Sequence, residues 1–420
     1  HNPRYTREVD GELGNWAYTN ESKNSRAKIK RYNYNADLIN ENGHHLAAAV
    51  HYPLVGMQSQ NDPDYIEYQI LLAKLAYIDG FMTDFRHLED KAGLDQLKVL
   101  REVAGRYGFE IGVDWCDAQI FYSLRKVRPD LDTREKQIDY CKCILKYLAK
   151  NVYQDETGAT ICGHPVILLF GDGFSFEEYH WLKQEINVFA PKEPWYFRRA
   201  MMECAYDGKN VTYFFDERHE YFTKEHRNEI AGPFGWVPFR LRDAVNDGKP
   251  YWDVYATEED CMAYMETLRS QATSGDYTAW ISVATPGMDQ RGCAAWGRAI
   301  TYLERGNGEL YKKFWEYNVN HREETDAVFI VSWNDFNEGH EIEPTEQNGY
   351  RELMLTMQYG AQFKGIERQV YAEELQVPNW LFQLRKKTDK LKKIGYSIAD
   401  ELLNEAAMLI AERNCSKARI

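Results

Sequence analysis

Residues 62–85 read DPDYIEYQILLAKLAYIDGFMTDF and contain the signal of a helix followed by that of a strand. Asp62 is a residue type that caps helix N-termini, and Pro63 suits the first helical position because the N–H that it lacks would have no partner there. Apolar side chains then recur at helical spacing until Gly80, which we expect to end the helix. Residues 81–85 are a short apolar run typical of a buried strand. The stretch therefore predicts one helix–strand unit.

The same unit repeats along the chain. Short apolar runs predict strands over residues 45–51, 81–85, 109–115, 165–170, 211–215, 234–237, 278–283 and 327–333. Helical patterns lie between them, at 94–108, at 257–268 and after Asp132, where Asp132 and Glu135 predict a capping box. Strands that alternate with helices predict βαβ units and a parallel sheet. This number of strands favours an α/β fold of the (β/α)8 TIM-barrel type.

An open doubly wound sheet is the other fold that such an alternation allows. The sequence has no GxGxxG after a strand and no GxxxxGK[ST], so it announces neither a dinucleotide site nor a nucleoside triphosphate site. We therefore expect three segments: an N-terminal extension over residues 1–43, the barrel as catalytic domain over 44–366, and a C-terminal helical segment over 367–420. The lysines of the last segment are typical of a solvated helix face.

Composition narrows the class of function. The chain has 420 residues, with 51 basic and 65 acidic side chains and a net charge of −14, which argues against a nucleic-acid-binding protein. No apolar run approaches 18 residues, so we expect no membrane span. Aromatic residues make up 14% of the chain, which fits either a carbohydrate-binding surface or ordinary packing. The eight cysteines set no disulfide framework.

Chemistry in such a barrel belongs at the carboxyl ends of the strands. The polar and aromatic residues that follow the predicted strands are therefore candidate substrate contacts: His51, Tyr52, Asp84, Trp115 and Trp236. Acids at Asp114, Asp117 and Asp172 raise the alternative of a calcium site, but no calcium-loop spacing is present. The sequence has no HExxH motif, which would indicate a zinc site. We therefore expect no metal and no cofactor.

The exit of the last strand carries the densest group of acids. Residues 332–344 read SWNDFNEGHEIEP, with Asp335 and Glu338 at i, i+3. Glycoside hydrolysis needs two carboxyl groups on a rigid support, one of which is protonated to release the leaving oxygen. Two neighbouring acids repel each other, so one pKa rises and that group can act as a general acid. The alternative is that Asp335 only caps the next turn and Glu338 is simply exposed.

The same residues carry a family resemblance. Residues 333–344, WNDFNEGHEIEP, resemble the WNEWxEGxxxEP signature of the glycoside hydrolase family 99-like barrels, which include the endo-α-mannosidases, and are similar to the NDYGESHY pattern of the family 71-like α-1,3-glucanases. Further similar stretches are HYPLVG at 51–56, DPDYIEYQ at 62–69, YIDGFMTD at 77–84 and AGPFGWV at 231–237. The resemblance covers roughly residues 44–366.

The resemblance implies roles for the site residues. Glu338 takes the position of the general acid/base, and Asp335 takes that of the partner carboxylate. In the mannosidase pattern the partner is Glu and acts as a base on the substrate's own 2-hydroxyl. Asp at this position fits the glucanase pattern, so an inverting route remains open. Trp333 and Asn334 would line the sugar site, and His340 would orient Glu338 or bind a hydroxyl.

These features together predict a glycoside hydrolase that cleaves α-linked bonds in a polysaccharide or glycan, and the resemblance implies endo action. The alternatives are a glycan-binding protein or a glycosyltransferase-like protein of polysaccharide assembly on the same barrel. The substrate class predicts a secreted, periplasmic or cell-surface location. The sequence leaves the oligomeric state open.

Overall fold

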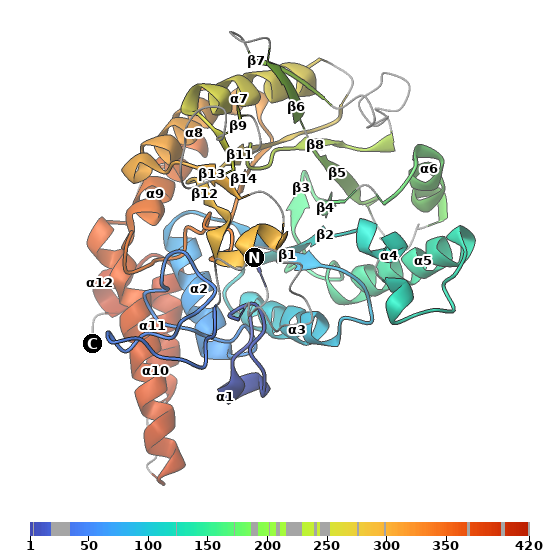
Figure 1. Cartoon of the computed structure of the whole chain (residues 1–420). Coiled ribbons are helices and arrows are strands. Elements are labelled where there is room, and N and C mark those ends of the chain that lie inside the picture. Colours follow the sequence, from blue (N-terminus) through green and yellow to red (C-terminus); the bar gives the residue numbers. More distant parts are fainter. Residues whose placement is uncertain are drawn as a thin grey trace.

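The computed structural model gives the arrangement of the chain in space (Figure 1). It describes residues 1–2, 4–17, 34–122, 124–171, 173–185, 192–200, 202–206, 211–215, 229–238, 242–243, 253–274, 277–297, 300–367, 370–395 and 400–418. None of the helices in these ranges is long and apolar enough to cross a membrane.

A parallel sheet forms the centre of the molecule. Its strands run in the spatial order β1 (Gly80–Phe85), β2 (Glu110–Trp115), β4 (His164–Leu169), β5 (Trp195–Arg199), β8 (Gly232–Phe234), β11 (Ile281–Ala284) and β14 (Ala327–Ile330). Each strand is parallel to its neighbours, and the short β3 (Thr160–Ile161) adds an antiparallel pair to β4. The predicted α/β architecture with a parallel sheet is thus confirmed.

A closed eight-stranded barrel is not found. Within the described ranges no ladder joins β14 to β1. The first residues of the chain lie between these two edges instead. Asp84 of β1 donates its backbone N–H to the carbonyl of His1 at 3.1 Å, and the backbone N–H of Asn2 donates to Oδ1 of Asn334, beyond the end of β14, at 2.7 Å.

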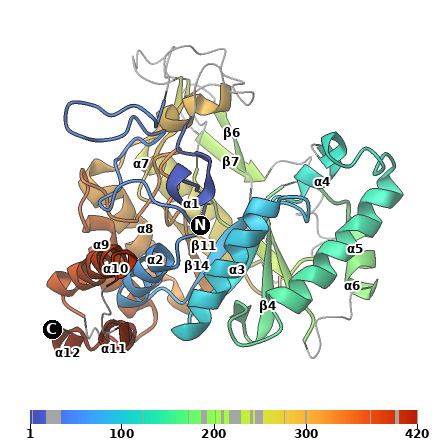
Figure 2. The same ribbon diagram turned by 90° about the horizontal axis from the view of Figure 1, so that it is seen from below.

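Helices connect the parallel strands and cover the sheet, as Figures 1 and 2 show. They are α2 (Pro63–Leu75), α3 (Lys91–Arg106), α4 (Ala118–Tyr122), α5 (Arg134–Asn151), α6 (Phe176–Glu185), α7 (Glu258–Ala272), α8 (Glu309–Asn320) and α9 (Arg351–Phe363), preceded by the single turn α1 (Arg7–Asp10). The predicted cap of α2 is confirmed, because the Asp62 side chain accepts the N–H of Asp64 and Pro63 is the first helical residue.

The C-terminal segment folds into α10 (Val377–Lys393), α11 (Asp400–Ala411) and α12 (Cys415–Ala418). Both α10 and α11 pack against α2, which Figure 2 shows at the same side of the molecule. The ring of Phe382 lies 6.3 Å from that of Tyr65 and 5.6 Å from that of Tyr68, and both tyrosines are fully buried. Arg385 forms an ion pair with Glu67 of α2.

Two local predictions on helix ends are wrong. The cap of α5 is Thr133, whose side chain accepts the N–H of Lys136, whereas Asp132 forms an ion pair with the ammonium of Lys136 at 2.7 Å. Gly80 does not end α2 but opens β1. A Cβ there would lie 2.5 Å from the backbone oxygen of Glu110, so this position needs glycine for close strand packing.

Several strand predictions also need correction. Residues 45–51 form no strand: His45 makes an isolated bridge with Ile39, and Val50 donates its N–H to the carbonyl of Phe336 in the loop after β14. Only Ala47 and Ala48 of the apolar run are buried, whereas Leu46 is exposed. Residues 211–215 do form a strand, β7 (Val211–Phe215), but it pairs with β6 (Met202–Tyr206) in an antiparallel hairpin outside the central sheet. The fourth parallel strand, β5, was not predicted.

A second, smaller sheet lies beside the end of β14. It has the order β12 (Met288–Asp289), β13 (Thr301–Leu303), β10 (Val254–Ala256) and β9 (Arg242–Asp243). Asp289 of β12 donates its N–H to the carbonyl of Glu338 at 2.8 Å. This sheet therefore supports the loop that carries the predicted acids.

Candidate active site

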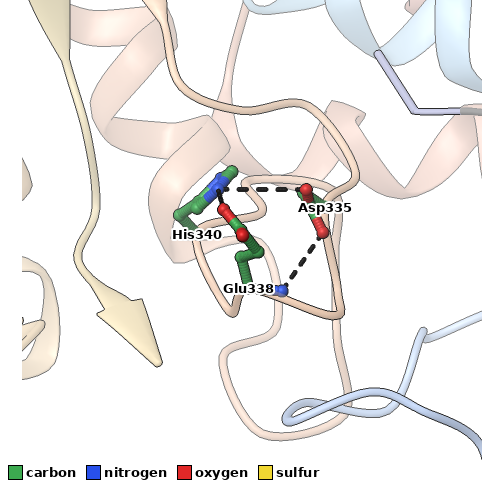
Figure 3. A group of neighbouring side chains, drawn as sticks. All are labelled: Asp335, Glu338 and His340. Atoms are coloured by element: carbon green, nitrogen blue, oxygen red, sulfur yellow. Dashed lines mark hydrogen bonds and ion pairs between the residues drawn. The ribbon is translucent and has the colours of Figure 1, made fainter. Parts of the chain in front are cut away.

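The loop that follows β14 brings three chemistry-bearing side chains together: Asp335, Glu338 and His340 (Figure 3). The loop turns tightly at Gly339, whose φ of 63° is left-handed and favours glycine. A Cβ at this position would lie 3.0 Å from Asp289, so the loop sits directly on β12. The sequence folds this way because a flexible residue stands where the backbone must reverse against a neighbouring strand.

Asp335 both shapes the loop and faces the other two groups. Its Oδ1 accepts the N–H groups of Asn337 and Glu338, each at 3.1 Å. Its Oδ2 lies 4.0 Å from Nε2 of His340. Asp335 therefore caps the turn, as the alternative interpretation of the sequence expected. Its Oδ2 faces the imidazole of His340.

Glu338 is the more accessible of the two acids, with its side chain 15% exposed. Its Oε2 lies 3.2 Å from Nε2 of His340, and its Oε1 accepts a hydrogen bond from the Gln290 side-chain amide at 3.2 Å. Gln290 begins a 3-10 segment, Gln290–Gly297, that follows β12. Both carboxylate oxygens of Glu338 are therefore oriented by neighbours.

His340 is buried, and its two ring nitrogens have different partners. Nδ1 lies 2.9 Å from Oγ of Ser332, and Nε2 faces Glu338 and Asp335. Burial lowers the pKa of His340, but the hydrogen bond to Glu338 and the charges of both acids outweigh it, so the net pKa is raised above its ordinary value. The imidazole thus tends to carry a positive charge between the two carboxyl groups.

Burial raises the pKa of Asp335, and the neighbouring charge of Glu338 raises it further. The positive charges of His340 and Arg4 oppose this rise; Nη2 of Arg4 lies 3.6 Å from Oδ1 of Asp335. Two close carboxyl groups and an imidazole between them interact strongly, so the three groups take up and lose protons together. Such a system can give a proton to a leaving group and take one back from water.

Asp84 and Asp114 form a second acidic pair, at the ends of β1 and β2. The two residues are register partners on neighbouring strands. Asp84 accepts from Arg86 at 3.3 Å and from the thiol of Cys116 at 3.3 Å. Burial, with the charge of Asp84, raises the pKa of Asp114 to about 7. The carboxyl of Asp114 is therefore half protonated at neutral pH and can donate or accept a hydrogen bond.

His51 and Tyr52 lie against the far end of the same loop. Nδ1 of His51 is 2.8 Å from Oε1 of Glu341, which also pairs with Arg305 at 2.7 Å. The charge of Arg305 overcomes the effect of burial and lowers the pKa of Glu341. The ring of Tyr52 stacks on that of His44, with centroids 4.3 Å apart.

The four other predicted substrate contacts separate into two groups. Trp236 is partly exposed, and its ring lies edge-on to His340 with centroids 6.2 Å apart. In contrast, Trp115 and Asn334 are fully buried, and Trp333 is nearly so. The indole of Trp115 donates to the carbonyl of Arg86, and Trp333 packs on Phe81. These three side chains shape the site from beneath and offer almost no surface to a sugar.

Of the acids considered for calcium, Asp114 belongs to the acidic pair with Asp84, Asp117 has protein partners, and Asp172 lies outside the described residues. Asp117 is fully buried, and its two oxygens accept the N–H groups of Gly171 and Gly173 at 2.7 and 2.8 Å. Asp172 and the polar segment Glu217–His219 after β7 are outside the described residues. Asp117 thus holds the loop after β4.

One group of side chains has the chemistry to hold a metal ion in the part of the chain that the structure describes. Asp335, Glu338 and His340 each offer one ligand atom, and these atoms lie within 4.8 Å of one another. Two carboxylates and an imidazole suit Zn²⁺ by ligand type. The guanidinium of Arg4 beside Asp335 competes with a cation for the same carboxylate.

Sequence reasoning missed Arg4, Ser332 and Gln290. Ser332 stands one residue before the family-like motif, so its position in the sequence was a usable signal. Arg4 and Gln290 come from distant segments that only the fold brings to the site.

The fold, but not the sequence, has matches among known proteins. No protein-family model and no curated protein matches the sequence. The structure of the family 99 endo-α-mannosidase from Bacteroides thetaiotaomicron matches with a TM-score of 0.61 and 15% identity, over 87% of this chain and 96% of that chain. Its complex with bis-tris-propane matches with a TM-score of 0.58 and 14% identity over the same shares.

The chain shares the fold of glycoside hydrolase family 99. A glycoside hydrolase-like protein also matches, with a TM-score of 0.55 and 10% identity over 78% of this chain and 92% of that chain. The resemblance read from residues 333–344 is thereby confirmed for the fold. In this family 99-like fold, Asp335, Glu338 and His340 lie beyond the carboxyl end of a parallel strand, where barrel enzymes carry their active sites.

Proposed function

We propose that this protein is a glycoside hydrolase that cleaves α-linked glycosidic bonds in a polysaccharide or glycan. The observation that carries the proposal is the convergence of Asp335, Glu338 and His340 within 4.8 Å at the exit of β14. Glycoside cleavage generally requires two carboxyl groups on a rigid support, and this loop carries two.

Glu338 is the general acid/base in this proposal. Its exposure lets a substrate reach it, and His340 and Gln290 fix its two oxygens. Glu338 gives its proton to the leaving oxygen as the glycosidic bond breaks. In the second step it takes a proton from the water that attacks the anomeric carbon, so the carboxyl returns to its starting state.

Asp335 is the partner carboxylate. An oxygen of Asp335 lies within 4.8 Å of one of Glu338, on the short side of the range for glycosidases. Retaining enzymes place their two carboxyls about 5–5.5 Å apart, and inverting enzymes leave about 6.5–9.5 Å for a water. The short spacing supports a retaining route. In its first step a carboxylate oxygen of Asp335 bonds to the anomeric carbon as the bond to the leaving oxygen breaks, and in the second step water displaces Asp335 from that carbon.

Substrate contacts are proposed for the accessible side chains around the acids. Trp236 offers a ring face beside His340, Asp84 accepts from sugar hydroxyls, and His51 and Tyr52 flank the loop. The solved relatives named as endo-α-mannosidases make α-mannans the first substrates to try and favour endo action. Because such a substrate lies outside the cell or in the periplasm, we also propose a secreted, periplasmic or cell-surface location for the protein.

The test is release of reducing ends from a panel of α-mannans, α-glucans and branched glycans by the wild type and by Glu338→Gln. Loss of the general acid is expected to lower the rate on natural glycans at least about 100-fold. With a glycosyl fluoride, which leaves without protonation, the same variant should lose much less of its first-step rate. Glu102→Gln, an exposed acid on α3, is the matched control and should keep full activity.

Three outcomes contradict the proposal. Equal activity of wild type and Glu338→Gln removes Glu338 from the chemistry. Saturable glycan binding without cleavage across the panel makes the protein a glycan-binding protein. Tight binding of a nucleotide sugar, again without cleavage, makes it an enzyme of glycan assembly.

A further inference from the structure

The guanidinium of Arg4 is buried in the loop that carries the two acids. Its Nε and Nη2 donate to the carbonyl of Asn334 at 3.1 and 3.0 Å. Its Nη1 donates to the carbonyl of Asn15 and to Oδ1 of Asn337, at 3.1 and 3.0 Å. The residue is 0% exposed. These contacts connect the N-terminal segment to both sides of Asp335 in the chain.

Two aromatic rings hold the plane of this guanidinium. Its central carbon lies 4.7 Å from the ring centre of Trp16 and 5.2 Å from that of Phe336, and both rings are fully buried. The rings themselves are stacked, with centroids 5.7 Å apart. Arg presents a rigid planar fork that stacks on aromatic faces, and Lys cannot reproduce this geometry.

The same guanidinium brings a positive charge to Asp335. Nη2 is 3.6 Å from Oδ1, the oxygen that accepts the N–H groups of Asn337 and Glu338. Asn2, from the same segment, donates its side-chain amide to Oδ2. The other charged groups that face Asp335 are Glu338, His340 and the α-amino group of His1, which also lies near Asp84 and Asp114.

We propose that Arg4 is a positioning residue for the catalytic loop: it fixes the backbone on both sides of Asp335 and so holds that carboxyl in place. The inference rests on the proposed function for the role of Asp335. It assigns to the N-terminal segment, 331 positions away along the chain, a part in the chemistry of the site. Arg4 acts through Asp335 and does not touch the reacting sugar.

Charge and geometry can be separated by three variants. Arg4→Met removes both the charge and the fork, Arg4→Lys restores the charge alone, and Arg4→Gln keeps two amide donors without charge. Arg7→Met is the matched control, because Arg7 lies in the same segment but is 58% exposed and pairs with Asp37. The measurement is the pH profile of kcat/KM on the best glycan substrate of the panel.

At the pH optimum of this profile we expect all three Arg4 variants to lower kcat about tenfold or more and to change KM little. None of the three side chains can hold both the carbonyl of Asn334 and the side chain of Asn337 as the planar guanidinium does. Full rescue by Arg4→Lys would show that charge alone matters and overturns the proposal, and so does an unchanged kcat in Arg4→Met.

A second readout needs no activity. Melting temperatures of wild type, Arg4→Met, Asn337→Ala and the double variant, taken at one pH, form a thermodynamic cycle. The two single losses should not add, because each variant breaks the same link between the N-terminal segment and the loop. If the wild type cleaves nothing, the proposed function fails while this coupling still tests the contact. Additive losses overturn the contact itself.

Discussion

Nε2 of His340 lies 3.2 Å from Oε2 of Glu338, while Nδ1 of the same ring is held by Ser332. Both ring nitrogens of His340 thus have a partner, and the partner of Nε2 is the proposed general acid, Glu338. A histidine hydrogen-bonded in this way has a defined orientation and a defined protonation partner. The loop after β14 therefore supplies the acid together with the group that sets its proton affinity.

His340→Gln should change the pH dependence of activity. The raised pKa of His340 means that its positive charge is present at acidic pH and is lost as pH rises through that pKa. Without this charge both carboxyls hold their protons to higher pH, so the acid limb of kcat/KM should move up by about one unit. His180→Gln, with its exposed side chain on α6, is the control. A profile of His340→Gln that superimposes on the wild type would exclude this role.

The stereochemistry of the product should be retained. An oxygen of each acid lies within the same 4.8 Å group, which leaves little room for a water between them. Proton NMR of the first product formed, before the anomers equilibrate, gives the answer directly. Initial formation of the opposite anomer would show that another acid, at a greater distance from Glu338, activates the water.

Glu343 should make stability depend on pH. It is buried, and its pKa is raised to about 7 by burial, although Tyr65 and Gln69 donate hydrogen bonds to it at 2.6 and 2.8 Å. Between its ordinary pKa and about 7 the folded chain binds more protons than the unfolded chain, so this group lowers stability as pH rises.

Glu343→Gln removes that proton uptake. The melting temperature of the variant minus that of the wild type should therefore increase from pH 5 to pH 8. Glu102→Gln, at an exposed acid that pairs with Arg106, should give a difference that stays level. A level difference for Glu343→Gln as well would mean that the carboxyl titrates in the same range in both states.

Arg305 should be essential for folding stability. It pairs with Glu341 at 2.7 Å and with Glu352 at 3.0 Å, and both carboxylates are buried. Arg305→Met leaves Glu352 without its cation and Glu341 with His51 alone, and breaking a buried pair costs about 3–5 kcal/mol. Urea unfolding measures the loss. Arg106→Met, which breaks the exposed pair with Glu102, should change stability by less than about 1 kcal/mol.

Zn²⁺ should inhibit the enzyme more strongly than Mg²⁺. Two carboxylates and one imidazole suit zinc, whereas magnesium prefers oxygen ligands alone. Metal binding must displace protons, so inhibition should strengthen as pH rises. Titration of activity with each chloride salt, for wild type and His340→Gln, measures this. Equal sensitivity of both proteins would place the inhibitory ion elsewhere.

Local sequence signals predicted the helix–strand units well. Asp62 and Pro63 start α2 where the pattern puts them, and the acids of the last loop were found from their density and from the family resemblance. Such features depend on neighbours in the chain, which is why composition and spacing reveal them.

The failures share a physical cause. The apolar run at 45–51 is buried only at Ala47 and Ala48, and burial against a loop and burial in a sheet look alike in sequence. The strand β5 has two arginines at its end, and one of them, Arg198, is buried against Tyr179 and Asp117. A charged residue whose partner is brought near only by the fold interrupts the apolar pattern by which a strand is recognised. The role of Arg4 was missed for a similar reason, since its partners are distant in sequence.

The packing of α10 and α11 on α2 has a consequence for synthesis. Tyr65 and Tyr68 are buried in part by Phe382, which the ribosome adds more than 300 residues later. At about 5–20 residues per second, one face of α2 stays uncovered for roughly 15–60 s. A nascent chain of this protein therefore displays an aromatic surface on α2 until α10 has been synthesised and can cover it.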